Sequence, residues 1–254
     1  MSEIRLERVS KWFGADSALR AVDGLGLEIA RGEMVALLGK TGCGKSTTFN
    51  LIAGLMEPSE GTVRVQGLDP FRNFDNLRGK IAVVFQNDRL LPWRSAIGNV
   101  ELGLEMLNRP QAQRREIAQR WLSRLGLAGH ENDFPHALSG GMRQRVSIAR
   151  AFATDASILL CDEPFSSLDE MTARDLRAEF LRLVKQDGKT AVFITHHINE
   201  AMDVGDRVLV FHRPARIAYE ARMDEAARKA GREAIQAEIL KVLSFEAPVA
   251  TPWD

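Results

Sequence analysis

This sequence of 254 residues contains only two cysteines, has no net charge and lacks long apolar runs. The two cysteines, Cys43 and Cys161, argue against a secreted disulfide scaffold and favour a reducing compartment. The 34 basic and 34 acidic side chains cancel, which removes the argument for a broadly basic nucleic-acid binder. No stretch approaches the roughly 18 consecutive apolar residues that a membrane helix needs, and the charged start at 1–10 is no signal peptide. We therefore expect a cytoplasmic protein, in which any membrane role comes through a partner.

The pattern of apolar residues predicts an α/β fold. Continuous apolar runs predict buried strands at residues 34–38, 158–161, 191–194 and 208–211. Alternating or short apolar stretches predict further strands at residues 4–9, 25–29, 61–65 and 81–85. Helical spacing lies between several of these runs, and strands separated by helices favour a largely parallel sheet.

The middle and the end of the chain depart from this pattern. Between residues 102 and 152, apolar side chains such as Trp121 and Leu122 recur at helical spacing among Arg and Glu. We interpret the region at about 88–155 as an inserted helical subdomain. Residues 221–254 are expected to form a short exposed helix and a loose tail.

The clearest motif is a glycine-rich loop between the predicted buried strand at 34–38 and a helix predicted from Thr47 to Leu55. It consists of Gly39, Lys40, Thr41, Gly42, Cys43, Gly44, Lys45 and Ser46, with Thr47 following. This order matches G-x-x-x-x-G-K-[ST], whose glycines let backbone N–H groups turn inward around phosphate oxygens. The helix N-terminus adds partial positive charge. In such a loop Lys45 reaches the β- and γ-phosphates and the Ser46 hydroxyl ligates Mg²⁺. The alternative is a glycine turn that binds no ligand.

A second motif supplies acids that could act on a bound nucleotide. The apolar run 158–161 ends at Asp162 and Glu163, at the carboxyl end of a strand, where ligands bind in open α/β sheets. Asp162 is expected to bind Mg²⁺, directly or through water. Glu163 points to the opposite side of the strand and can polarise the attacking water as general base. In isolation, an apolar run ending in Asp-Glu is as often an ordinary strand end.

Together with further motifs in the same order, these residues resemble the ATP-binding-cassette (ABC) ATPases. The segment 138–145, LSGGMRQR, resembles the signature motif of that family. Gln86 stands at the position of the Q-loop glutamine, Asp169 at that of the D-loop aspartate and His196 at that of the switch histidine. The resemblance extends from about residue 3 to residue 218.

The resemblance implies a fold with three parts within residues 1–220. These are a P-loop NTPase (RecA-like) α/β core, an N-terminal antiparallel β-subdomain and the inserted α-helical subdomain. It also implies that Phe13 stacks on adenine, with Trp12 as the competing residue, and that Gln86 contacts Mg²⁺. His196 is implied to contact the γ-phosphate and to orient the attacking water.

The signature motif implies a second phosphate-binding device. Ser139 can cap a helix that begins with Gly140 and Gly141, and a helix N-terminus behind small residues favours anions. In the family, the signature of one copy closes over the phosphate loop of another. Two copies then pack head to tail with ATP in their interface, and Asp169 of the D-loop is implied to belong to the same nucleotide site.

The stretch 86–95 resembles importers of nitrate, taurine and other alkanesulfonates. In that region the family meets the coupling helix of the membrane permease, and Leu90, Leu91 and Trp93 suit such docking. Core packing of these apolar residues is the alternative. Importers of bicarbonate, pyrimidines or thiamine precursors share the same features, so the solute stays open. Asn87-Asp88 stands where the family usually has an acidic residue and a proline.

The leading hypothesis is therefore the energy-coupling subunit of an ABC importer. Two copies are expected at the inner face of the cell membrane, bound to two permease subunits that receive solute from a binding protein. Three alternatives are an exporter or lipid-trafficking ATPase, a soluble ATPase acting on nucleic acid or ribosomes, and a regulator without turnover. The Leu-Leu-Pro-Trp stretch disfavours the first and the single cassette disfavours the second. The presence of Glu163, Gln86 and His196 disfavours the third.

Overall fold

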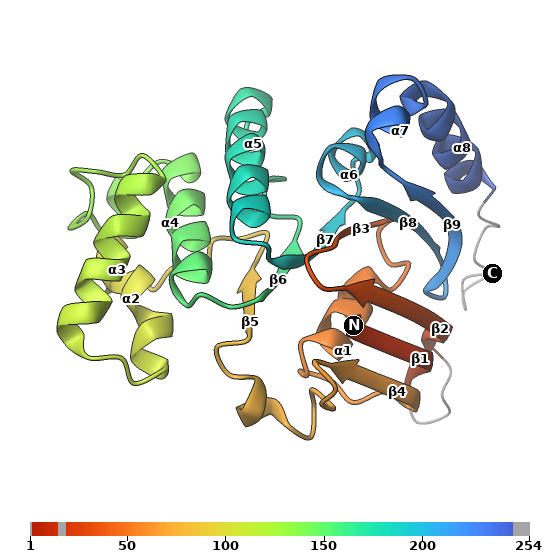
Figure 1. The fold of residues 1–254 in the computed structure, drawn as a ribbon, viewed down its shortest axis with the longest axis horizontal. Coiled ribbons are helices and arrows are strands. Elements are labelled where there is room, and N and C mark those ends of the chain that lie inside the picture. Colours follow the sequence, from red (N-terminus) through yellow and green to blue (C-terminus); the bar gives the residue numbers. More distant parts are fainter. Residues whose placement is uncertain (1, 15–18, 246–254) are drawn as a thin grey trace. The chain divides into compact units, whose positions relative to one another are not determined.

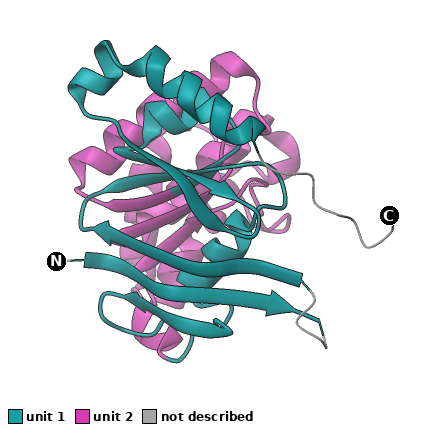
Figure 2. Cartoon of the chain, turned by 90° about the vertical axis from the view of Figure 1, so that its right-hand side faces the viewer, with its two compact units in different colours: residues 1–72, 193–254 teal, residues 73–192 magenta. Residues whose placement is uncertain are grey.

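The structure, a computed structural model, describes residues 2–14 and 19–245. The expected tail after residue 245 lies outside these residues. The chain divides into two compact units, shown in Figure 2, of which unit 1 comprises residues 1–72 and 193–254 and unit 2 residues 73–192. Unit 2 is larger than the helical insertion expected at about 88–155, because it also takes in a pair of strands and a long helix.

Unit 1 begins with an antiparallel sheet. Its strands are β1 (Ser2–Phe13), β2 (Leu19–Ala30) and β4 (Glu60–Val65), in the order β2-β1-β4. Leu6 of β1 lies opposite Leu27 of β2 and Val63 of β4, and all three side chains are buried. Alternate residues thus build one apolar face, as the period of two predicts. The N-terminal antiparallel β-subdomain is confirmed.

The rest of unit 1 surrounds a fully buried strand, β3 (Met34–Leu38). β3 pairs in parallel with β8 (Arg207–His212), which pairs antiparallel with β9 (Arg216–Arg222). Figure 1 shows the helices of this unit, whose bounds are α1 (Lys45–Ile52), α6 (Ile198–Val204), α7 (Glu225–Lys229) and α8 (Arg232–Ser244). α6 packs on β3 and β8, and α8 packs on β8 and β9.

Unit 2 combines a parallel pair of strands with four α-helices. β5 (Ile81–Val84) pairs with β6 (Ile158–Asp162). The helices are α2 (Ala96–Met106), α3 (Gln111–Arg124), α4 (Gly140–Ala153) and α5 (Glu170–Gln186), with short 3₁₀ turns at Phe74–Leu77 and Pro135–Ala137. β7 (Thr190–Thr195) crosses the boundary between the units. In the described parts of both units, no helix combines the length and apolarity needed to cross a bilayer.

An aromatic cluster joins three helices of unit 2. Trp121 of α3 lies 5.1 Å from Phe152 of α4, measured between ring centroids. Phe152 lies 5.7 Å from Phe180 of α5, which in turn lies 5.9 Å from Phe165. The last two pairs meet edge to face, a geometry that the ring quadrupole favours. Phe180 is fully buried at the centre of this cluster.

We expect Phe180→Ala to lower the free energy of unfolding of unit 2 by about 3–5 kcal/mol, because it leaves a cavity between three packed helices. Urea unfolding followed by circular dichroism measures the change. The control is Phe71→Ala, which removes a ring that is 43% exposed and should cost less than about 1 kcal/mol. Equal losses in both variants would contradict a central role for the cluster.

Candidate nucleotide site

The glycine-rich loop lies in unit 1, between the end of β3 and the start of α1. Gly42 and Gly44 have φ values of 80° and 102°, in the left-handed region that favours glycine. A Cβ atom on Gly44 would collide with the carbonyl oxygen of Ala21, and one on Gly39 would lie 2.7 Å from Cys43 Sγ. The glycines are therefore required by the close packing of the loop as well as by its backbone angles.

The first turn of α1 is open to an anion. Gly44 is the N-cap residue and supplies no side-chain hydrogen bond to the helix. The first N–H groups of a helix have no partner within the helix, and they carry partial positive charge. Ser46 is exposed in this turn, with Thr47 half-buried beside it. This arrangement fits a phosphate group and leaves the Ser46 hydroxyl accessible to a metal ion.

Lys45 places a positive charge inside the same loop. Its ammonium donates to the carbonyl oxygens of Gly39 at 2.6 Å and Lys40 at 3.0 Å, and lies 3.8 Å from Cys43 Sγ. The residue is only 6% exposed. The long side chain thus folds back over the loop, and its charge lies within the loop.

The two aromatic residues considered for adenine stacking lie at the end of β1. Phe13 is 37% exposed, and Lys11 Nζ lies 5.5 Å from the centre of its ring. Trp12 is less exposed, and the Arg20 guanidinium lies 5.9 Å from its ring. The greater exposure favours Phe13, and its stacking on adenine stays a prediction.

His196 also belongs to unit 1 and follows the last residue of β7. It is exposed, and its ring centroid lies 4.0 Å from that of His197. The Thr195 hydroxyl donates to the Glu200 carboxylate and accepts the backbone N–H of His197 at 3.0 Å. The connection that carries His196 is therefore fixed on both sides of the histidine.

Three further motif residues lie in unit 2, at one edge of its strand pair. Val84 of β5 and Cys161 of β6 are register partners in parallel strands. Gln86 follows Val84 by two residues, whereas Asp162 and Glu163 follow Cys161 directly. Because carboxyl ends of parallel strands meet at the same edge, the structure brings the amide and the two carboxylates to that edge together.

The backbone at Glu163 has an unusual conformation. Its φ is 46°, in the left-handed region that few residues other than glycine adopt. The carbonyl oxygen of Glu163 accepts from the Ser166 hydroxyl at 3.0 Å and from the Ser166 N–H at 3.3 Å. Such conformations cluster at functional sites, where the surroundings hold them. Cys161 before it is fully buried, which raises the pKa of its thiol far above the usual range and leaves it unreactive.

The signature serine caps a helix, as its sequence predicts. Ser139 is the N-cap residue of α4, and its hydroxyl oxygen accepts the backbone N–H of Met142 at 3.3 Å. Gly140 and Gly141 are the first residues of that helix. With glycine at its first two positions, the helix N-terminus is open to an anion.

The D-loop aspartate caps the next helix beside it. The Asp169 carboxylate accepts the backbone N–H of Thr172 at 3.0 Å at the start of α5. That N–H, as the largest cause, holds the pKa of Asp169 below its usual value. A Cβ atom on Gly141 would lie 3.0 Å from Thr172 Cγ2. The N-termini of α4 and α5 are therefore neighbours within unit 2.

Arg143 and Arg150 of α4 hold the loop that follows Gln86. Arg143 Nε pairs with the Asp88 carboxylate at 2.9 Å. Arg150 donates to the carbonyl oxygens of Asp88 at 2.7 Å and Arg89 at 2.9 Å. These contacts attach the loop at Asp88 and Arg89 to α4. Neither arginine was predicted to hold this loop, because charged residues on an amphipathic helix usually face water.

A buried amide holds the other end of this loop. Asn99 of α2 is fully buried. Its side chain accepts the Leu91 N–H at 2.7 Å and donates to the carbonyl oxygens of Leu91, Arg94 and Ser95 at 3.0–3.2 Å. A single asparagine in an apolar helix was the only signal in the sequence for this role.

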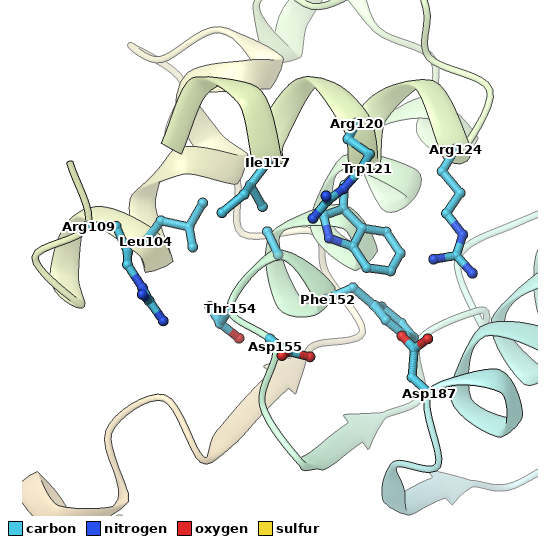
Figure 3. Close-up of a pocket in the computed structure, with 11 residues that line it drawn as sticks. Leu104, Arg109, Ile117, Arg120, Trp121, Arg124, Phe152, Thr154, Asp155 and Asp187 are labelled. Atoms are coloured by element: carbon cyan, nitrogen blue, oxygen red, sulfur yellow. The ribbon is translucent and has the colours of Figure 1, made fainter. Parts of the chain in front are cut away.

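A cavity of about 400 Å³ in unit 2, shown in Figure 3, contains none of the expected site residues. Arg109 just beyond the end of α2 and Arg124 at the end of α3 line it. Cationic side chains are stabilising at helix C-termini. Arg124 also donates to Gln186 at 2.8 Å and lies over the Trp121 ring. These contacts explain Arg124 without a ligand, and none of the residues expected to bind nucleotide lines the cavity.

The sequence profile described as ABC transporter matches residues 22–166 of the chain. The chain belongs to the ABC transporter family. It is 45% identical over 190 residues to the taurine import ATP-binding protein TauB of Yersinia pestis, covering 75% of this chain and 73% of that protein. It is 38% identical over 238 residues to TauB of Pseudomonas aeruginosa, covering 93% and 89%.

A solved structure agrees with this assignment. The dimeric ATP-binding cassette MJ0796, in a post-hydrolysis state bound to ADP and phosphate, matches with a TM-score of 0.77 and 34% identity. The match covers 87% of this chain and 99% of that one. The P-loop NTPase fold is thereby confirmed, and this ABC protein is an ATP hydrolase of a transporter.

We expect Lys45→Ala to weaken ATP binding about ten- to hundredfold, because hydrogen bonds from a charged donor to phosphate are lost. Titration with a fluorescent ATP analogue measures the affinity. Lys185→Ala, which removes an exposed lysine from α5, serves as the control and should bind normally. Unchanged affinity of the Lys45 variant would remove this lysine from the site.

Proposed function

We propose that this ABC ATPase is the energy-coupling subunit of an importer for a small solute of the taurine, alkanesulfonate or nitrate type. Two copies bind two ATP molecules between them and drive a membrane permease from its cytoplasmic side. A solute-binding protein delivers the solute to the permease. The two TauB relatives support the class of solute.

The observation that carries the ATPase part is the phosphate loop. At Gly39 and Gly44 the loop packs too closely for a side chain, and the open N-terminus of α1 and the enclosed Lys45 ammonium present positive charge to a phosphate. In the proposed complex, loop N–H groups bind the β-phosphate and Lys45 bridges the β- and γ-phosphates. Phe13 stacks on the adenine ring.

The residues at the strand ends carry out the chemistry. Glu163 accepts a proton from the attacking water, while Gln86 and His196 orient that water and the γ-phosphate. The required positions are held in advance by the backbone conformation at Glu163 and the hydrogen bonds around Thr195. Preorganised groups lower the barrier because they need no rearrangement during reaction.

Magnesium fits the donor set assigned to it. The expected ligands are the Ser46 hydroxyl, the Gln86 amide oxygen and the Asp162 carboxylate. Mg²⁺ prefers such oxygen ligands and usually takes one or two carboxylates together with phosphates and water. Within the described residues no cluster of three His, Cys, Asp or Glu offers a closed metal cage. When bound, the ion would neutralise charge that develops on the transferred phosphoryl group.

The signature of a second copy completes the proposed site. Ser139 and Gly141 stand at an open helix N-terminus next to the Asp169 cap. A helix N-terminus binds the γ-phosphate side of a nucleotide well, since its N–H groups and dipole favour anions. The solved dimeric cassette with ADP and phosphate supports two copies as the active form. Loss of γ-phosphate contacts after hydrolysis would let the pair open.

We expect Glu163→Gln to keep ATP affinity while lowering the rate of phosphate release by about 100-fold or more, because the general base is lost and the binding groups remain. Phosphate release under saturating ATP measures the rate. Glu116→Gln, which alters an exposed carboxylate of α3, is the matched control. A wild-type rate in the Glu163 variant would refute its role as base.

Two exposed apolar features of unit 2 support docking of a permease helix. Trp93 is 71% exposed, whereas Leu90 is 9% exposed and packs inward. A second feature is a cavity of about 280 Å³. Its apolar lining includes Phe74, Ile81, Val83, Leu102, Met106 and Leu107. Arg150 lines the same cavity and binds the backbone of the loop after Gln86. A helix seated there would therefore contact a residue that holds this loop.

We expect Trp93→Ala and Met106→Asp each to reduce recovery of the permease with this subunit at least about tenfold, since both remove exposed apolar anchors. Phosphate release by the isolated subunit should stay within twofold of wild type. Leu55→Ala removes another exposed apolar side chain and is the control. Undiminished recovery with both variants would move the docking surface elsewhere.

The proposed transport function is tested with the tagged subunit, purified from detergent-solubilised membranes of its native host. Two permease subunits per two copies are expected to co-purify. In vesicles containing that assembly and its solute-binding protein, radiolabelled taurine and nitrate then report ATP-dependent uptake. Only soluble proteins or nucleic acid at stoichiometric amounts would contradict the importer assignment.

A further inference from the structure

The C-terminal helices α7 and α8 contain no motif residue, yet they pack against the helix that follows His196. α8 packs on α6 as well as on β8 and β9, and Figure 1 shows α6, α7 and α8 together in this part of unit 1. Ile239 of α8 is fully buried. His212 Nε2 lies 3.0 Å from the carbonyl oxygen of Val242. The segment is therefore an integral part of unit 1.

Arg228 of α7 binds the end of α6 with nearly its whole guanidinium group. Nη1 donates to the carbonyl oxygens of Met202 at 2.8 Å and Asp203 at 3.0 Å, and Nη2 donates to that of Gly205 at 2.6 Å. Nε donates to the carbonyl oxygen of Met223 at 2.9 Å. The last carbonyl groups of a helix have no partner within the helix, and a cation there also opposes the helix dipole.

Arg232 at the start of α8 makes a second attachment to the same helix. Its Nη2 pairs with the Asp203 carboxylate at 2.8 Å. The same atom donates to the carbonyl oxygen of Asn199 at 3.4 Å and to its side-chain oxygen at 3.5 Å. Two arginines from two successive helices thus bind α6 from its first turn to its end.

The other end of α6 is continuous with the switch histidine. His197 is the N-cap residue of α6, and its carbonyl oxygen accepts the Ala201 N–H at 3.0 Å. The Glu200 carboxylate accepts from the Thr195 hydroxyl before the histidine. A displacement of α6 would therefore move the short connection that carries His196.

We propose that Arg228 and Arg232 are positioning residues for ATP hydrolysis that hold His196 in place through α6. α6 has seven residues, a length of about 10 Å, and a helix so short is not stable by itself. Its packing on β3 and β8 and the groups bound at its two ends together set its orientation. This inference rests on the proposed function, because it requires that His196 act in hydrolysis.

The experiment measures ATP hydrolysis by the full chain with Arg228→Ala and Arg228→Lys. The alanine variant should lower kcat about tenfold with KM for ATP within about twofold, since small displacements of a catalytic group cost rate rather than affinity. The kcat of the lysine variant should lie between those of the wild type and the alanine variant, because lysine keeps the positive charge but loses the planar set of guanidinium donors. Lys229→Ala is the matched control, since this neighbour pairs with Glu225 within α7 and should leave kcat unchanged.

A double-mutant cycle separates positioning from general stabilisation. In a His196→Ala background, Arg228→Ala should lower kcat by less than about twofold more, since the group it positions is already gone. A full tenfold loss in both backgrounds would overturn the proposal, as would wild-type kcat in Arg228→Ala. Should Arg228→Ala fail to fold in a thermal melt, Arg232→Ala is used in the same cycle, with a loss of about threefold expected in the wild-type background only.

The two proposals can fail separately. A lowered kcat in His196→Ala with wild-type kcat in the arginine variants would leave the ATPase mechanism intact and refute the positioning role of the arginines. Wild-type kcat in His196→Ala would refute the role of this histidine, and with it the positioning role of the two arginines.

Discussion

The phosphate loop depends on the close approach of backbone to backbone at Gly44. A Cβ atom there would collide with the Ala21 carbonyl oxygen of β2 and would lie 2.7 Å from Ala215 Cβ. The same two segments bind each other, because Ala215 N–H donates to the Ala21 carbonyl oxygen at 2.8 Å and Asp23 N–H donates to that of Ala215 at 3.2 Å. The loop therefore packs at Gly44 against both the antiparallel sheet and the β8–β9 turn. Only glycine allows that contact, which fixes the backbone of the loop at the start of α1.

Much of this arrangement follows from patterns in the sequence. β3 and β6 were predicted because continuous apolar runs bounded by glycine or acids have few other interpretations. The helix after the loop was expected from Thr47 to Leu55, whereas α1 is Lys45–Ile52. Because Gly44 is the N-cap residue, α1 starts earlier in the chain than expected. Gly54, with a φ of 73°, lies just past its end. Gln86 and the acids after β6 follow the same edge of one strand pair, because the parallel register aligns Val84 of β5 with Cys161 of β6.

Other parts of the structure have no pattern in the sequence that predicts them. β9 was not predicted, because its residues are mostly exposed and only Ala221 is buried. The register shift between Val210 and Phe211 in its pairing with β8 further hides the pattern. Arg150 and Arg228 were missed for a different reason. An arginine on a helix is normally solvated, and its binding to a distant carbonyl group depends on tertiary distances that a single sequence does not contain.

These arginines share a physical role, since each binds backbone carbonyl oxygens of a segment that follows a residue proposed for ATP hydrolysis. Arg150 binds the backbone of the loop after Gln86, and Arg228 binds the backbone at the end of α6. A guanidinium group stays protonated at all physiological pH values, and its donors spread over several acceptors in one plane. Burial of Arg150 lowers the pKa of its guanidinium, yet arginine starts from so high a value that the charge persists. Carbonyl acceptors do not titrate either. Both attachments should therefore hold their backbone segments equally well across the physiological pH range.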